Sequence, residues 1–140
     1  MSKKNDVKTI LDEWLSGIPA VRCYSQKMKI YAPTCKGKCE GAVKKLETRV
    51  NEILLGSTTY KASGCWWDDE KKDMVCEPNH VIEAAHNCHD KKTLAKIASA
   101  IADYAVEANQ TDMAILNNHF YLAQRIPLVE YTEELQAQLR

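Results

Sequence analysis

The sequence lacks most of the features that would assign a function directly. It has no apolar run near the roughly 18 residues that a membrane-spanning helix needs, and its start, MSKKNDVKTILDEWL, turns acidic too early for a secretory signal. It also has no P-loop, no G-x-S-x-G, no H-E-x-x-H and no G-x-G-x-x-G motif. These absences predict a cytoplasmic protein that does not associate with membranes and that carries no common catalytic signature.

An excess of charge of either sign is absent as well. The 140 residues include 19 Lys and Arg and 19 Asp and Glu, so the formal net charge is zero, which argues against a nucleic-acid partner. There is no repeat, no low-complexity run and no linker, and 45% of the residues are apolar, so we expect a single domain over residues 1–140. The six cysteines of a cytoplasmic chain are expected to be mostly reduced.

What the sequence does contain is an alternation of helix and strand patterns. The order β-α-β-β-α-β, with an appended C-terminal hairpin strand and an extra N-terminal helix, predicts an α+β protein with a ferredoxin-like core. We expect its first and third strands to lie side by side and parallel, with both main helices on one face of the sheet. Apolar spacing predicts helices over 6–16, 40–55 and 91–109, and strands over 22–33, 57–67, 74–85, 112–116 and 119–124. The domain would divide into a helical extension (1–25), the ferredoxin-like core (26–125) and a C-terminal tail (126–140).

Two tryptophans are adjacent in the predicted strand GSTTYKASGCWWDD, residues 56–69. Successive side chains of a strand point to opposite faces, so only one of the two indoles can enter the core. The residues that alternate with Trp66, including Tyr60 and Gly64, are the more apolar set. This predicts that Trp66 is buried and that Trp67 lies on the open face of the sheet. Three covers for that face remain open: the N-terminal helix, a second copy of the chain in a homodimer, or a small-molecule ligand.

Four stretches resemble one protein family: IYAP (30–33), GSTTYKASGCWWDD (56–69), CEPNHVIEAA (76–85) and NQTDMAILNNHFYLA (109–123). From Met28 onward the chain resembles a family of small uncharacterised ferredoxin-like domains that occur in bacteria and in their phages and plasmids. The resemblance implies the fold more than a function, because the family has no established activity. It includes neither residues 1–25 nor the cysteines. The matching positions are Pro33, Gly56, Thr59, Gly64, Trp66, Glu77 and Gln110.

The predicted parallel pairing would bring two loops to one edge of the sheet. The loops TCKGKC (34–39) and HNCHD (86–90) follow the first and third strands and hold thiol and imidazole groups of the kind that bind zinc. The alternative to a zinc site is that these cysteines are free thiols or packed side chains. No other cofactor is predicted. The candidate metal ligands are Cys35, Cys39, His86, Cys88 and His89.

The same edge would gather the N-termini of both main helices. The unpaired N–H groups and the dipole of a helix N-terminus favour an anionic ligand such as a nucleotide, and nearby lysines would add positive charge. The alternative is that the 34–39 loop is merely solvated. The candidate ligand-binding residues are Lys36 and Lys38 in that loop, Asp90 as the N-cap of the 91–109 helix, and Trp67 on the open face.

Few residues are candidates for catalysis. Glu77 and Glu83 share one face of a predicted strand and would make an acid–base pair, but alternating charge on a strand usually marks a solvated surface. Cys65 and Cys76 would face each other across a hairpin, either as a disulfide or, more readily in a reducing compartment, as packed thiols.

The sequence therefore favours a non-catalytic binding protein, encoded by a phage or another mobile element and homodimeric, that engages a protein partner or a small anionic ligand. One alternative is a metal-dependent or nucleotide-processing enzyme that uses the 34–39 and 86–90 loops. The other is a zinc-binding or thiol-sensing protein.

Overall fold

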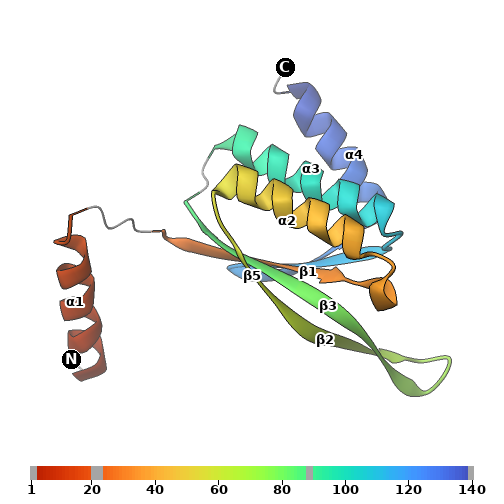
Figure 1. Ribbon diagram of the computed structural model, residues 1–140, viewed down its shortest axis with the longest axis horizontal. Helices are drawn as coiled ribbons and strands as arrows, with labels where there is room; N and C mark the ends of the chain where they lie inside the picture. The colour runs from red at the N-terminus through yellow and green to blue at the C-terminus, as the bar shows by residue number, and fades with distance from the viewer. Residues whose placement is uncertain (1–2, 20–23, 88–89, 139–140) are drawn as a thin grey trace.

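The computed structural model describes residues 3–19, 24–87 and 90–138, and it shows an α+β protein built on one five-stranded antiparallel sheet (Figure 1). The predicted α+β class is confirmed, and the helices and strands follow in the predicted order, except that the predicted C-terminal tail forms a further helix, α4. The helices are α1 (Lys3–Ser16), α2 (Glu40–Leu54), α3 (Lys91–Glu107) and α4 (Arg125–Gln138), with a short 3-10 helix η1 (Cys35–Gly37). The strands are β1 (Gln26–Pro33), β2 (Thr58–Asp68), β3 (Asp73–His86), β4 (Asp112–Asn117) and β5 (His119–Gln124).

The strands lie in the order β2-β3-β1-β4-β5. β1 and β3 are neighbours, as predicted, but they run antiparallel, with Gln26 opposite His86 and Pro33 opposite Asn79. The prediction of parallel pairing is wrong because the chain crosses over through α2 to β2 and then reverses in the β2–β3 hairpin. β3 therefore enters the sheet against the direction of β1.

The core lies between the sheet and the helices α2 and α3, which cover one face of it (Figure 1). Alternation along β1 turns Met28, Ile30 and Ala32 toward the helices, and all three are buried. α2 meets them with Leu46 and Val50, which are four residues apart and so share one side of the helix. α4 packs against α3 and β5.

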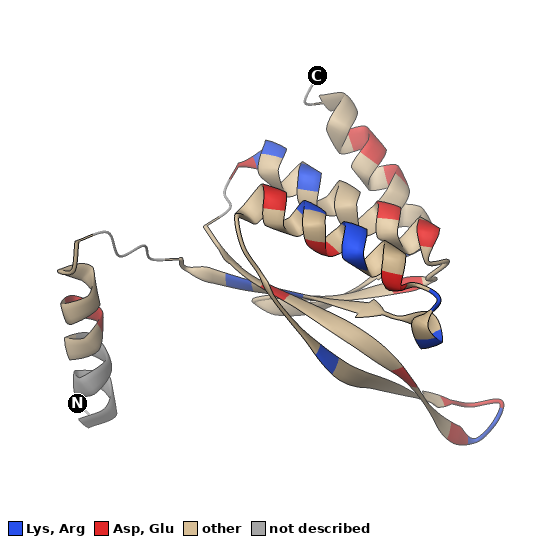
Figure 2. Cartoon of the chain, in the orientation of Figure 1, with Lys and Arg blue, Asp and Glu red and all other residues tan. Residues whose placement is uncertain are grey.

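Charged residues of both signs are interspersed along α2 and α3 (Figure 2). Lys45 of α2 lies 2.9 Å from Glu107 of α3, and Arg49 forms an ion pair with Asp103. These pairs run in opposite order along the two helices, so the helices are antiparallel and their N-termini lie at opposite ends. The predicted gathering of both N-termini at one edge is therefore wrong.

The β2–β3 hairpin projects beyond the helices (Figure 1). The 14 residues of β3 extend roughly 45 Å, whereas the 15 residues of α2 reach only roughly 22 Å. Trp66 and Trp67 lie in the projecting part and are 49% and 60% exposed. The register places Trp66 on the open face and Trp67 on the helix side, so the predicted burial of Trp66 is wrong and the two faces are reversed.

The N-terminal helix α1 stands away from the sheet (Figure 1). Its apolar residues Ile10, Leu11, Trp14 and Leu15 are exposed, so α1 does not cover the open face. Neither α1 nor any other described helix is long and apolar enough to cross a membrane.

Candidate functional site

The open face of the sheet holds a cavity of about 810 Å³. Its floor consists of side chains at alternate positions of β1, β2 and β3, and its opposite wall comes from β4, β5 and the loop before β4. A volume of this size is typical of a site for a small molecule.

The lining of this cavity combines negative charge with aromatic rings. Glu77 and Asp112 are its acidic residues, and no Lys, Arg or His occurs among the described residues that line it. Tyr31 and Phe120 contribute rings whose centroids are 6.2 Å apart, and Trp66 contributes an indole. Carboxylates and the faces of aromatic rings both attract cations. The cavity is therefore suited to an organic cation and not to an anion.

Glu77 is a half-buried carboxylate on β3, in the floor of the cavity. Burial raises the pKa of its carboxyl above 4.5, because the protein solvates the negative charge less well than water does. A bound cation would reverse this penalty. The cavity thus holds a carboxylate whose charge is poorly compensated by the protein itself.

The predicted acid–base pair of Glu77 and Glu83 is not brought together. Both residues lie on the open face, as predicted, but they are six residues apart on β3, which is roughly 20 Å along the strand. Glu83 instead forms an ion pair with Lys27 of β1. Only Glu77 lines the cavity.

A buried tyrosine of α3 forms a hydrogen bond with the end of β1 beside the cavity. Tyr104 is 2% exposed, and its hydroxyl donates a hydrogen bond to the carbonyl oxygen of Pro33. Burial, with a further contribution from the Glu77 carboxylate, raises the pKa of this phenol far above its ordinary value. Tyr104 therefore stays protonated through the neutral range and remains a hydrogen-bond donor.

The floor of the cavity contains a buried amide. Asn79 is 8% exposed, and its Oδ1 has no hydrogen-bond partner among the residues that the structure describes. On the neighbouring strand β2, a Cβ atom at Gly64 would clash with Nδ2 of Asn79. Glycine is therefore required at position 64 for the amide to lie where it does.

Two disulfides flank the cavity. Cys65 faces Cys76 across the β2–β3 hairpin, as the predicted register requires, and the two are bonded. Cys35 is bonded to Cys39 around η1, and Gln110 donates to the Cys35 sulfur with an Nε2–Sγ distance of 3.6 Å. The prediction of reduced thiols is wrong for these four residues, because the folded chain holds each pair together.

The two loops of the predicted zinc site lie at opposite ends of β1. The 34–39 loop follows the end of β1, whereas the antiparallel register puts His86 beside Gln26 at its start. Cys35 and Cys39 are bonded to each other and so are not available as thiolate ligands.

His86 is buried, and its Nε2 lies 3.0 Å from Oδ1 of Asn117. Cys88 and His89 lie outside the described residues. Within the parts of the chain that are described, no group of three potential metal ligands occurs. The parallel pairing that the zinc prediction assumed is absent, so the predicted ligands that the structure describes, Cys35, Cys39 and His86, do not converge.

The residues predicted to bind an anion do not converge either. Lys36 and Lys38 are exposed beside the N-terminus of α2, whereas Asp90 begins α3 at the opposite end of the sheet. Trp67 lies on the helix side of the projecting hairpin. The prediction of a shared anion site is wrong for the same reason as the zinc site.

Asp90 has the capping role that the sequence predicts. Its carboxylate accepts hydrogen bonds from the Lys92 amide at 3.1 Å and from the Thr93 hydroxyl at 3.2 Å. We expect Asp90→Ala to lower the free energy of unfolding by about 1 kcal/mol, measured by urea denaturation. The exposed turn residue Asp69, changed to Ala, serves as the control and should cost less than about 0.5 kcal/mol. Equal effects of the two changes would contradict the cap.

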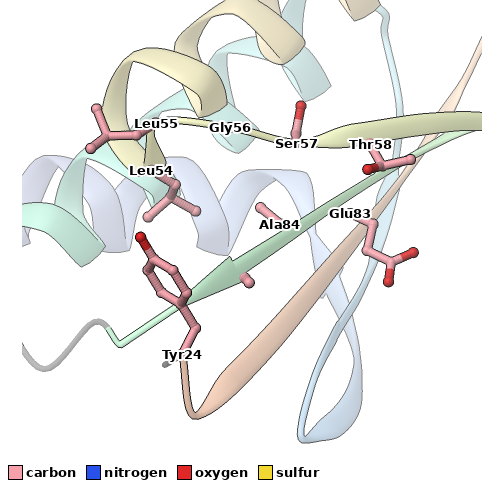
Figure 3. Close-up of a pocket in the computed structure, with 9 residues that line it drawn as sticks. Tyr24, Leu54, Leu55, Gly56, Ser57, Thr58, Glu83 and Ala84 are labelled. Atoms are coloured by element: carbon pink, nitrogen blue, oxygen red, sulfur yellow. The ribbon is translucent and has the colours of Figure 1, made fainter. Parts of the chain in front are cut away.

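A smaller hollow of about 330 Å³ lies near the other end of the sheet (Figure 3). Leu54 and Tyr24 lie close together there, and the carboxylate of Glu83 is directed away from both. Its lining mixes aliphatic side chains with the hydroxyl groups of Tyr24, Ser57 and Thr58, and its volume is less than half that of the open-face cavity.

The sequence analysis missed Asn79, Asp112 and Phe120 as site residues. The resemblance to a family of small domains stays a prediction, but five of its seven matching positions line the cavity. These five are Pro33, Gly64, Trp66, Glu77 and Gln110.

Comparison with known proteins finds a likeness in fold alone. No protein-family profile matches the sequence, and no curated protein matches it. A phage SAM lyase in its apo state is similar with a TM-score of 0.51 and 10% sequence identity, over 76% of this chain and 94% of that chain. A phage SAM lyase in complex with S-methyl-5'-thioadenosine is similar with a TM-score of 0.49 and 11% identity, over 71% of this chain and 88% of that chain. The structure that is similar with a TM-score of 0.51 is that of an enzyme, and this finding contradicts the prediction of a non-catalytic binding protein.

Proposed function

We propose that the protein is a lyase that cleaves S-adenosylmethionine, with the open-face cavity as its active site. The observation that carries the proposal is the lining of the cavity, which pairs two carboxylates with three aromatic rings and has no basic residue among those described. S-adenosylmethionine is an organic cation with a permanently charged sulfonium, so this lining attracts it and repels nucleotide phosphates. The likeness in fold to a phage SAM lyase supports the same substrate.

Such a lyase does not need a catalytic group that activates the leaving group, because a sulfonium already departs readily as a neutral thioether. The substrate's own carboxylate bonds the γ-carbon of the amino-acid part as the bond between that carbon and sulfur breaks. The electron pair of the broken bond stays on sulfur, so the products are the neutral thioether 5'-methylthioadenosine and a homoserine lactone, and no second reactant is needed. Positioning of the substrate is then the main contribution of the site. We assign Glu77 to bind the cationic region of the substrate and so to hold the bond that breaks in position; because the positive charge on sulfur is lost in the step, its contribution is to binding and orientation.

The proposal is tested by incubating the purified protein with S-adenosylmethionine and measuring 5'-methylthioadenosine by liquid chromatography and mass spectrometry. We expect product without any added cofactor and at an equal rate in the presence of a metal chelator. Heat-inactivated protein corrects for the spontaneous decay of the substrate. Product formation no faster than in that control would refute the lyase.

Binding of a sulfonium should weaken as the pH falls through the raised pKa of Glu77. A bound cation favours the ionised carboxylate, so binding releases a proton, and the affinity rises with pH until it levels off above the pKa of the free protein. Calorimetric titration with S-methylmethionine between pH 4 and pH 8 measures this dependence. It should be smaller in Glu77→Gln, and an unchanged pH profile in that variant would exclude Glu77 as its source.

Three finer predictions belong to this proposal. A ferredoxin-like core is supported by the central position of β1 and β3 between β2 and β4. A homodimer is supported by Ile10, Leu11 and Trp14 of α1, which are exposed outside the cavity and which a second copy would cover. An origin in a phage or another mobile element is supported by the solved structures, which are described as phage proteins. Light scattering tests the dimer, since a mass of 15.9 kDa at all concentrations would exclude it.

A further inference from the structure

We infer that Asn79 binds the heterocycle of the nucleoside half of the substrate, while Glu77 serves the sulfonium half. This inference rests on the proposed function. The two residues occupy alternate positions of β3, so they point to the same face and lie roughly 7 Å apart along the strand. In S-adenosylmethionine the ribose separates the adenine from the sulfur by a comparable span. The cavity thus offers two subsites of different chemistry at a spacing that one substrate can bridge.

The amide of Asn79 has the features of a group that a ligand completes. It is 8% exposed, lines the cavity, and has an Oδ1 without a partner among the described residues. A buried polar atom without a hydrogen bond is costly, and such atoms are rare in folded proteins. An amide carries both a donor and an acceptor, and its terminal torsion is soft, so it can pair with the edge of an uncharged heterocycle such as adenine.

The surroundings of Asn79 leave room for a planar ring. Asn79 is flanked by small side chains on both neighbouring strands, Pro33 on β1 and Ala62 on β2. Gly64 adds no side chain at all, and a Cβ there would displace the amide. Trp66 follows two residues later on the same face of β2 and offers a surface for stacking.

The experiment uses two probes that each represent one half of the substrate. 5'-Methylthioadenosine carries the nucleoside without the charge, and S-methylmethionine carries the sulfonium without the nucleoside. By calorimetry, we expect Asn79→Leu to lower the affinity for 5'-methylthioadenosine about tenfold or more. The same change should alter the affinity for S-methylmethionine less than about twofold. Glu77→Gln should show the opposite pattern. Asn79→Leu should melt no lower than the unsubstituted protein, because it removes the buried Oδ1 that has no partner among the described residues.

Gly64→Ala provides a second route to the same test. This change keeps Asn79 but moves its amide. It should therefore lower the affinity for 5'-methylthioadenosine, as Asn79→Leu does, and leave the affinity for S-methylmethionine unchanged. The inference is overturned if the unsubstituted protein does not bind 5'-methylthioadenosine, if neither variant changes that binding, or if both probes weaken equally. Asn79-dependent binding of 5'-methylthioadenosine without turnover of S-adenosylmethionine would refute the lyase and keep the nucleoside site. Turnover combined with binding that does not depend on Asn79 would refute the nucleoside site alone.

Discussion

Glu77→Gln is expected to lower kcat/KM for the cleavage of S-adenosylmethionine by about 100-fold or more while it makes the folded protein more stable. The loss of activity follows from the loss of a carboxylate in a cavity where, among the described lining residues, Asp112 is the only other charged one. Glutamine has the same shape, so the change removes charge without opening space. Steady-state kinetics at neutral pH measures the effect.

The gain in stability follows from the sign of the pKa shift. Burial raises the pKa of Glu77, so the folded state binds its proton more tightly than the unfolded state, and ionisation destabilises the fold as the pH rises through the folded pKa. Glutamine removes this cost at neutral pH and so raises the free energy of unfolding. The increase should be less than about 1 kcal/mol, because the side chain is only partly buried. Below pH 4.5 the carboxyl is protonated in both states and the gain should vanish.

Glu83→Gln is the matched control, because Glu83 lies on the same strand and the same face but outside the cavity. It should leave kcat/KM unchanged within about twofold and should not stabilise the protein, since it breaks the ion pair with Lys27. Equal losses of activity in Glu77→Gln and Glu83→Gln would mean that the cavity is not the active site. A lower melting temperature for Glu77→Gln at neutral pH would contradict the raised pKa.

Leu46→Ala is expected to lower the free energy of unfolding by about 2 to 5 kcal/mol. Leu46 is 1% exposed and packs in the core between α2 and the sheet, so its truncation leaves a cavity that rigid neighbours do not refill. For a chain of this length the melting temperature should fall by about 6 to 20 °C. Urea denaturation and thermal melting measure both quantities.

The same substitution at Leu55 is its control. Leu55 follows α2 directly but is 78% exposed, so Leu55→Ala should change the free energy of unfolding by less than about 0.5 kcal/mol. Similar costs at the two positions would show that α2 does not pack on the sheet through Leu46.

Much of the fold was predictable because its signals are local. Apolar spacing places α2 and α3 within two residues of their predicted ends, and the turn between Asp68 and Asp73 sets the register that brings Cys65 opposite Cys76. The N-cap at Asp90 is equally local, since it depends on two neighbouring groups of the first turn. The candidate site was less predictable, because the alternation that places Glu77 and Asn79 on one face of β3 does not indicate whether that face is solvated or forms a cavity.

The amino-acid sequence by itself determined where helices and strands form, how the hairpin pairs and which apolar faces need burial, because these follow from the periodicity and turn chemistry of short segments. Only the tertiary structure decided that β3 runs against β1, which separates the 34–39 loop from His86. It also decided the surroundings of both tryptophans, because a strand rises more than twice as far per residue as a helix and so carries the hairpin past the end of the helical layer. The open-face cavity depends on the tertiary structure in the same way. Glu77 and Asn79 lie on β3 and Gln110 lies before β4, and no short stretch of sequence shows that these segments are close together.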